Sequence, residues 1–273
     1  MNFSICNELF EGWPFERVCR FVKELGYDGL ELAPFTLAPT ITELDQASRG
    51  ELRRQAADAG VSILGLHWLL AGTEGLHLTS PDPSVRRRTA EYLVALAEAT
   101  RDLGGTLMVF GSPKQRSLLP GVTEDQAFAH ALDTFRTAMP GVASAGVTIC
   151  MEPLSPAETD FINTCAEGAR LVEAVGDPNF VLHLDVKAMS SESTPIPALI
   201  DQFAPRMGHF HANDANRRGP GFGDVDFVPI FKALRAAGYD RWVSVEVFDF
   251  SPDPETIARG SIDYMRKSLI PNP

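Results

Sequence analysis

Cysteines and basic residues are scarce in this sequence, and long hydrophobic runs are missing. The 273 residues include four cysteines with no CxxC pair among them, so neither a disulfide framework nor a cysteine-rich zinc site is indicated. The opening MNFSICNELFEGW has neither the basic nor the apolar region of a signal peptide, and we expect a cytoplasmic protein with reduced thiols. No apolar stretch reaches about 18 residues, so we predict no membrane-spanning helix.

Acidic residues outnumber basic ones. The chain carries 36 Asp and Glu against 24 Lys and Arg, which gives a formal net charge of -12. Charge of this sign opposes binding to nucleic acid and to anionic lipid surfaces, and it favours chemistry on a small molecule. Hydrophobic residues at 44% and charged residues at 22% are typical of a globular protein with a sizeable core.

Short apolar segments alternate with longer amphipathic segments along the whole chain, a pattern typical of repeated strand–helix units. The predicted strands are Asn2–Cys6, Gly29–Ala33, Val61–His67, Thr106–Phe110, Val147–Glu152, Val181–Asp185, Met207–His211 and Val243–Val247. The predicted helices are Phe15–Leu25, Ile41–Ala59, Pro83–Leu103, Glu124–Ser144, Cys165–Val175, Pro197–Phe203, Val228–Ala237 and Pro254–Ser268. Several helices are followed by glycine, as in KELGYDG and RDLGG, and glycine is common just after the last helical turn.

Parallel strands joined by helices form either a closed barrel or an open doubly wound sheet. No GxGxxG motif follows the first predicted strand, and a (β/α)8 barrel needs about 250 residues. No linker or low-complexity stretch divides the chain. We therefore predict the α/β class and a single (β/α)8 TIM barrel domain over residues 1–273.

Four consecutive predicted strands end on residue types that bind metals. VTICMEP ends its strand at Glu152, VLHLD at Asp185 and MGHFH at His211, and VSVEV carries Glu246. The carboxyl ends of the strands form the active site in such barrels, so these side chains are predicted to meet. Three carboxylates repel one another unless a cation lies between them, and with one imidazole they suit Mn²⁺, Mg²⁺, Co²⁺ or Zn²⁺. Strand ends held by ordinary ion pairs are the alternative.

These motifs carry a family resemblance. CMEPLSPAE around Glu152, LHLD at Asp185, HFHANDANRRGPGFGDVDF around His211 and VSVEV at Glu246 resemble the xylose-isomerase-like TIM barrels, particularly the ketose 3-epimerases. The resemblance covers essentially the whole chain. It implies one divalent metal ion per chain, manganese before others, held by these four residues. It also implies a carbohydrate substrate and a homodimer or homotetramer.

The same resemblance implies roles in a reaction. Glu152 and Glu246 would form the acid–base pair, while Glu158 and Arg217 would hold the substrate. A metal that chelates a ketone oxygen and the adjacent hydroxyl acidifies the neighbouring C–H and stabilises an enediolate. Return of the proton on the opposite face inverts the centre, and return at the adjacent carbon isomerises the sugar. Two glutamates beside a metal therefore suit an epimerase or an isomerase.

One departure from the family pattern bears on the substrate. The chain reads DVKA, with Ala188 where the free-ketohexose epimerases have a histidine and with Lys187 just before it. Lys114 and Arg116 follow the fourth predicted strand on the same expected face. Together with Arg217 these cations are candidates to bind a phosphate or carboxylate group, so a modified or anionic sugar is the expected substrate. Solvated surface cations are the alternative.

Other residues near the predicted barrel mouth give weaker signals. His67 ends the third predicted strand and is a candidate to contact the sugar, with a packing role as the alternative. Glu31 lies at the end of the second strand in the same way. His183 and His209 share strand parity with the ligands that follow them, so we predict that they point inward, one layer deeper, as core histidines or as partners of the ligands.

Other functions compete with a sugar epimerase or isomerase. A lyase or dehydratase on a keto-inositol or 3-keto-sugar would begin with the same proton abstraction and then expel a leaving group. A non-catalytic sugar-binding protein would not need the complete ligand set. A DNA-repair endonuclease with three zinc ions is disfavoured, because the chain has only six histidines and an acidic net charge.

Overall fold

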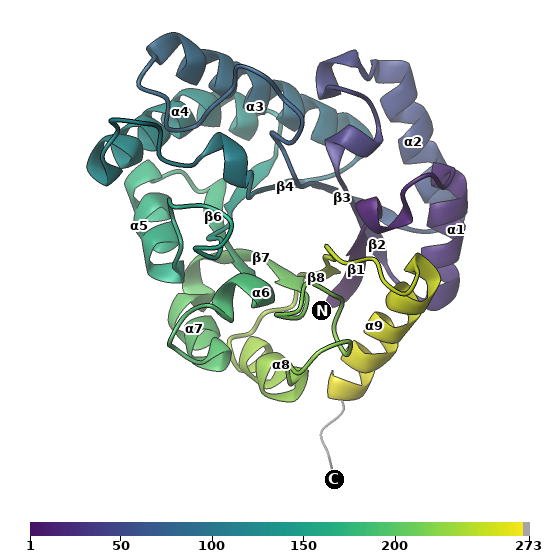
Figure 1. Cartoon of the computed structure of the whole chain (residues 1–273). Coiled ribbons are helices and arrows are strands. Elements are labelled where there is room, and N and C mark those ends of the chain that lie inside the picture. The colour runs from purple at the N-terminus through teal and green to yellow at the C-terminus, as the bar shows by residue number, and fades with distance from the viewer. Residues whose placement is uncertain (270–273) are drawn as a thin grey trace.

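Within the described residues, 1–269, eight parallel strands pair in chain order and close into a barrel, because β1 pairs with both β2 and β8. In the computed structural model, the helices form an outer ring around these strands (Figure 1). The predicted α/β class and (β/α)8 TIM barrel are therefore confirmed. The prediction of one domain over residues 1–273 includes residues outside the described part and stays a prediction.

The strands are short and the helices longer, as the alternating pattern predicted. The strands are β1 Asn2–Cys6, β2 Gly29–Leu32, β3 Ser62–Leu66, β4 Leu107–Phe110, β5 Thr148–Met151, β6 Phe180–Asp185, β7 Met207–Ala212 and β8 Trp242–Val245. The α-helices are α1 Phe15–Leu25, α2 Gln46–Ala59, α3 Pro83–Leu103, α4 Glu124–Ser144, α5 Cys165–Val175, α6 Val186–Met189, α7 Ile196–Phe203, α8 Phe227–Ala236 and α9 Pro254–Leu269. Short 3-10 helices lie at η1 Asn7–Phe10, η2 Pro34–Thr36, η3 Ile41–Glu43, η4 Pro113–Gln115 and η5 Ala204–Arg206.

The second helix differs most from its prediction. It was expected to begin at Ile41, but the chain makes the 3-10 turn η3 there and α2 begins at Gln46. Asp45 explains the later start, because its side chain accepts a 2.7 Å hydrogen bond from the backbone N–H of Ser48 and caps the helix.

Other helix boundaries also follow local sequence signals. Thr123 and Thr164 begin α4 and α5 with capping boxes, in which each hydroxyl accepts a hydrogen bond from the backbone N–H of Gln126 or Glu167. Gly26 ends α1 with a φ of 89°, in the left-handed region that glycine adopts without strain. These signals fix where each helix returns the chain to the next strand.

Apolar side chains fill the barrel below the strand ends. Leu64, Leu107, Val109 and Cys150 form a buried cluster from neighbouring strands β3, β4 and β5. A larger buried cluster joins strand residues to the surrounding helices. Since Cys150 lies two residues before Glu152 on the same side of its strand, the inner cluster forms a floor beneath the polar strand ends.

Candidate active site at the carboxyl ends of the strands

The four predicted metal ligands lie together at the carboxyl ends of neighbouring strands. Asp185 ends β6 and His211 lies in β7, while Glu152 and Glu246 directly follow β5 and β8. All four residues are at most 5% exposed. Donor atoms of Glu152, Asp185 and His211 lie within 4.8 Å of one another. Nδ1 of His211 lies 3.1 Å from Oε2 of Glu246. The structure thus brings the whole predicted set together.

Both carboxylate oxygens of Asp185 accept hydrogen bonds. Oδ1 accepts a 2.7 Å bond from the backbone N–H of Ala188 and so caps α6, a short helix that was not predicted. Oδ2 accepts a 2.5 Å bond from Nδ2 of Asn213. The other amide atom of Asn213, Oδ1, accepts a 2.7 Å bond from the backbone N–H of Lys187. This network fixes the direction in which the Asp185 carboxylate faces the other ligands.

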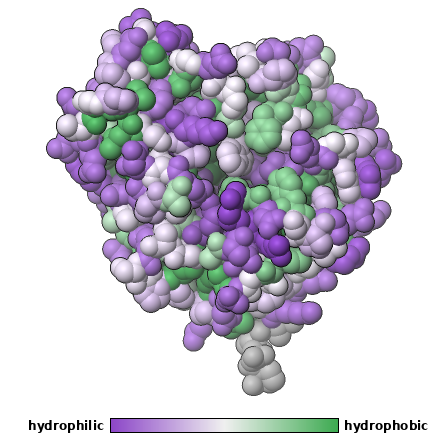
Figure 2. Space-filling model, viewed as in Figure 1, coloured by the Kyte–Doolittle hydropathy of each residue, from purple (hydrophilic) through white to green (hydrophobic). Residues whose placement is uncertain are grey.

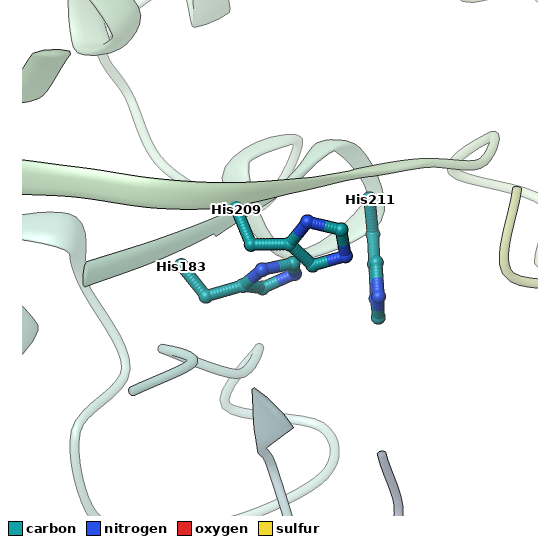
Figure 3. Close-up of side chains that lie close together, drawn as sticks. All are labelled: His183, His209 and His211. Atoms are coloured by element: carbon teal, nitrogen blue, oxygen red, sulfur yellow. The ribbon is translucent and has the colours of Figure 1, made fainter. Parts of the chain in front are cut away.

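Three buried histidines project from β6 and β7 into one region of the barrel, and the ring of His211 stands across the other two (Figure 3). Ring centroids of His183 and His211 are 4.1 Å apart, at an interplanar angle of 74°. Donor atoms of His183 also lie within 4.8 Å of those of Glu152, Asp185 and His211. Within the described residues, neither ring nitrogen of His183 has a hydrogen-bond partner. His183 is therefore a further candidate ligand, and its strand parity with Asp185 was the signal for it.

Carboxylates and imidazoles alternate in a line across the barrel mouth. In order, the members of this line are Glu8, His67, Glu246, His211, Glu31 and His209. The closest N···O distances between successive members are 3.0, 3.5, 3.1, 3.1 and 2.8 Å. Glu31 thus supports His211 from the side opposite Glu246. Glu8 was missed from the sequence because it lies in η1, beyond the apolar strand that was used to locate strand ends.

Burial and mutual repulsion make these carboxylates unfavourable as neighbouring anions. Burial raises the pKa of Glu152 well above its ordinary value, and the charges of Glu246 and Asp185 raise it further. Burial also raises the pKa of Asp185, to about 6. Burial opposes ionisation of Glu246 too, yet His211 and His67 hold its pKa well below the ordinary value. A divalent cation among these groups would relieve the repulsion, and the oxygen and nitrogen donors fit such an ion.

Lys187 and Glu158 form an ion pair at the rim of the mouth. Nζ of Lys187 lies 2.5 Å from Oε1 of Glu158 and 4.2 Å from the ring centroid of Phe248. Oε2 of Glu158 accepts a 2.8 Å hydrogen bond from the hydroxyl of Ser155. Burial opposes the charge on Lys187, but the carboxylates of Asp185 and Glu158 raise its pKa. The ammonium group is therefore charged and already paired.

Arg116 was expected to face the substrate, and the structure places it inside the barrel wall instead. It is 0% exposed. Its guanidinium donates hydrogen bonds to the backbone carbonyls of Gly111 at 3.2 Å, Glu152 at 2.6 Å and Ile162 at 2.8 Å. Since these donors are used within the wall, Arg116 joins the segments after β4 and β5 and does not reach a substrate.

The described residues do not assemble the cation cluster that was expected for an anionic substrate. Lys114 is exposed in η4. Arg217 is also exposed, with its guanidinium carbon 5.9 Å from the ring centroid of Phe248. Lys187 is paired and Arg116 is enclosed. Lys187 and Arg217 both lie near Phe248, but with Lys187 paired and Arg116 enclosed the four cations do not form one anion site.

A small cavity of about 20 Å³ lies over the two glutamates. Its lining includes Glu152, Glu246, His67, Trp68 and Phe248. The rings of Trp68 and Phe248 meet at 63° with centroids 6.0 Å apart and narrow the opening. Trp68 has a φ of 53°, a strained value for a non-glycine residue and one that concentrates at functional sites. His67, the residue expected to contact the sugar, lies at this cavity.

A family model of the xylose isomerase-like TIM barrel matches residues 19–268. The chain belongs to this family. It is 29% identical over 246 residues to the L-ribulose 3-epimerase of Mesorhizobium japonicum, with 89% of this chain and 79% of the relative covered. It is 25% identical over 255 residues to the 3-dehydro-D-guloside 4-epimerase of Escherichia coli, with 90% and 92% covered. Its fold matches a crystal structure of D-psicose 3-epimerase in the presence of D-fructose with a TM-score of 0.86 at 24% identity, covering 98% and 99% of the two chains.

These similarities confirm the predicted family. The relatives are named as epimerases, which are isomerase-class enzymes, and the predicted enzyme class is confirmed at that level. Among the described helices, none has the combination of length and apolar character needed to cross a membrane.

Proposed function

We propose that the protein is a sugar epimerase of the ketose 3-epimerase type that uses one divalent metal ion. The observation that carries the proposal is the position of Glu152 and Glu246. These residues directly follow β5 and β8, line one cavity and lie beside the other two candidate ligands, Asp185 and His211. Similarity to an L-ribulose 3-epimerase and a D-psicose 3-epimerase supports a ketose as substrate.

The residues that would hold the metal are Glu152, Asp185, His211 and Glu246, and His183 is close enough to join them. A divalent ion bound there would polarise the substrate carbonyl and stabilise the negative charge that develops when the neighbouring C–H bond breaks. Manganese is the ion we expect, and magnesium, cobalt and zinc are the alternatives that suit the same donors.

The two glutamates would divide the proton transfer. One carboxylate takes the proton from the carbon beside the carbonyl, which leaves an enediolate, and the other returns a proton from the opposite side and inverts the centre. His67 and His211 contact Glu246 on two sides and fix its orientation. Transfer between two separate carboxylates explains inversion, because a single carboxylate would return the proton to the face from which it came.

Residues at the rim would position the sugar and limit access of water. Glu158 lies at the small cavity beside Glu152 and is the nearest candidate to accept hydrogen bonds from sugar hydroxyls. Arg217, with its guanidinium carbon 5.9 Å from the ring centroid of Phe248, is a second candidate contact. The facing rings of Trp68 and Phe248 would cover a bound sugar, and exclusion of water strengthens the electrostatic interactions beneath them.

Metal analysis followed by proton exchange in D₂O tests this proposal. The purified protein should carry about one divalent ion per chain, and a ketose substrate should incorporate deuterium at the inverted carbon. Glu152→Gln and Glu246→Gln should each abolish turnover, because an amide can bind a metal but cannot carry the proton. Near-native turnover in either variant would remove that glutamate from the acid–base pair. Loss of water or of another leaving group from a keto-inositol or 3-keto-sugar would identify a lyase instead.

Assembly and location remain predictions. A homodimer or homotetramer is expected, and light scattering after size-exclusion chromatography measures it. A cytoplasmic location is expected from the reduced cysteines and is checked by cell fractionation.

A further inference from the structure

A large cleft opens beside the barrel mouth, between the segments that precede α1 and α2 and the segment that follows β8. Its volume is about 1000 Å³. We call it the side cleft. Its apolar walls include Phe10, Trp13, Phe15, Phe35, Leu52 and Phe250. Figure 2 shows apolar side chains on this face between its centre and the edge where α1 and α2 lie in Figure 1.

The side cleft neighbours the small cavity over the glutamates. Trp68 and Phe248 line both. Glu8 lines the side cleft, and its Oε2 lies 3.0 Å from Nε2 of His67, which lines the small cavity. A molecule whose reacting part lies at the glutamates would therefore extend past the rings of Trp68 and Phe248 to place a second part in the side cleft.

The size and surface of the side cleft do not fit a free monosaccharide. Ligand sites of roughly 300–1,000 Å³ enclose drug-sized molecules, so this volume is at the upper end for a small-molecule site. Phe35, in its wall, is 45% exposed and is one of two large hydrophobic residues so exposed within the described residues. Aromatic walls favour flat apolar groups, and exposed apolar area of this kind marks binding sites.

The charged residues around the side cleft do not form an anion site. Glu8, Glu11 and Glu51 line it, and Arg217 is the one cation among its lining residues in the described part of the chain. The guanidinium of Arg217 lies toward Phe248, at the mouth side. Glu51 is paired with Arg54 at 2.6 Å, and Glu8 contacts His67 at 3.0 Å. The lining therefore offers an anion no group of unpaired cations, and its apolar walls favour a neutral group.

We propose that the substrate is an aryl glycoside whose ketone lies on a ring carbon other than the anomeric one, with the reacting carbon beside that ketone at the glutamates and a neutral aromatic aglycone in the side cleft. The inference rests on the proposed epimerase function for the sugar ring, and it adds the chemical class of the group attached to that ring. The aglycone would pack against Phe35 and Phe250, beyond the rings of Trp68 and Phe248 that line both cavities.

Calorimetric binding of two unreactive probes to the metal-loaded protein tests the side cleft without relying on turnover. The probes are 4-nitrophenyl β-D-glucopyranoside and methyl β-D-glucopyranoside. The aryl glucoside should bind tighter by about tenfold or more, the effect expected when one aromatic ring is buried. Phe35→Ala and Ala47→Trp, which respectively remove a wall and fill the side cleft, should reduce this preference. Both positions are exposed, so the fold should persist, and circular dichroism verifies that.

Val228→Ala is the matched control, because Val228 is 43% exposed but lies in α8, outside the lining of the side cleft. Its aryl preference should equal that of the parent protein. Equal affinity for the two probes in the parent would overturn the inference, even if ketoses exchange deuterium. Aryl preference without exchange on any ketose or any glucoside with a ring ketone would support the side cleft and reject the proposed epimerase function. An oligomer that dissociates in Phe35→Ala would show that a second copy of the chain covers the cleft, and would also overturn the inference.

Discussion

Replacing Arg116 should destabilise the fold by an amount that the structure allows to be worked out. Three hydrogen bonds from a charged donor contribute roughly 1.5–3 kcal/mol each. Against this, burial lowers the pKa of Arg116 to about 10. At about 1.4 kcal/mol per pH unit, this shift offsets roughly 3 kcal/mol of the stabilisation that the hydrogen bonds give. Arg116→Met should therefore lower the free energy of unfolding by about 4 kcal/mol, mostly because three buried carbonyls lose their donor.

Urea unfolding followed by circular dichroism measures this change, and a thermal scan supports it. A loss of about 4 kcal/mol in the free energy of unfolding corresponds to a Tm lower by roughly 8–16 °C in a protein of this size or somewhat smaller. Arg116→Lys keeps the charge but not the planar fork of donors, so its loss should be intermediate. Because Arg116 donates to the carbonyl of Glu152, both variants should also reduce turnover.

Arg87→Met is the matched control, since Arg87 is exposed on α3 and the chemical change is the same. It should alter the free energy of unfolding by less than about 0.5 kcal/mol. An Arg116→Met protein as stable as this control would refute the reasoning, because it would mean that the three carbonyls find other donors at no cost.

Three further predictions concern the metal, the rim and the cysteines. Asp185→Ala and His211→Ala should each lose most of the bound divalent ion, and plasma emission after dialysis would contradict the ligand assignment if it found full occupancy. Lys187→Met should raise the KM of a sugar phosphate and of the matching neutral sugar by similar factors, because Lys187 is already paired with Glu158; a selective effect on the phosphate would restore an anionic substrate. Cys6, Cys19, Cys150 and Cys165 are buried free thiols, so Ellman's reagent should react with them only after denaturation, and rapid reaction of the native protein would show that the interior opens readily.

The barrel could be predicted from the sequence because each of its repeating units carries a local signal. Short apolar runs and amphipathic segments that end on glycine are defined by neighbouring residues alone, so they can be recognised without knowledge of tertiary contacts. The start of α2 was misplaced because the segment around Ile41 is apolar enough to continue a helix pattern, while the cap at Asp45 overrides it.

Strand-end residues were predictable for a similar reason, and loop residues were not. The alternation of side chains along a strand determines that Asp185 and His211 face the barrel interior. No such rule determines the direction of Arg116 or Lys187, which lie beyond strand ends and take their positions from distant partners. Three carbonyls enclose Arg116, and Glu158 holds Lys187.

The candidate ligands and the side cleft come from different parts of the gene. Glu152, Asp185, His211 and Glu246 all lie in the second half of the chain, whereas most of the side-cleft wall comes from residues 7–68. Besides the backbone pairing of β4 with β5, the halves are joined by Arg116, which donates to the Glu152 carbonyl, and by Glu31 and His67, which contact His211 and Glu246. Half-barrel recombination, in which the first half is exchanged with that of a family member, is therefore a route to new substrate ranges that keeps the four candidate ligands, provided that the incoming half supplies residues equivalent to Glu31, His67 and Arg116.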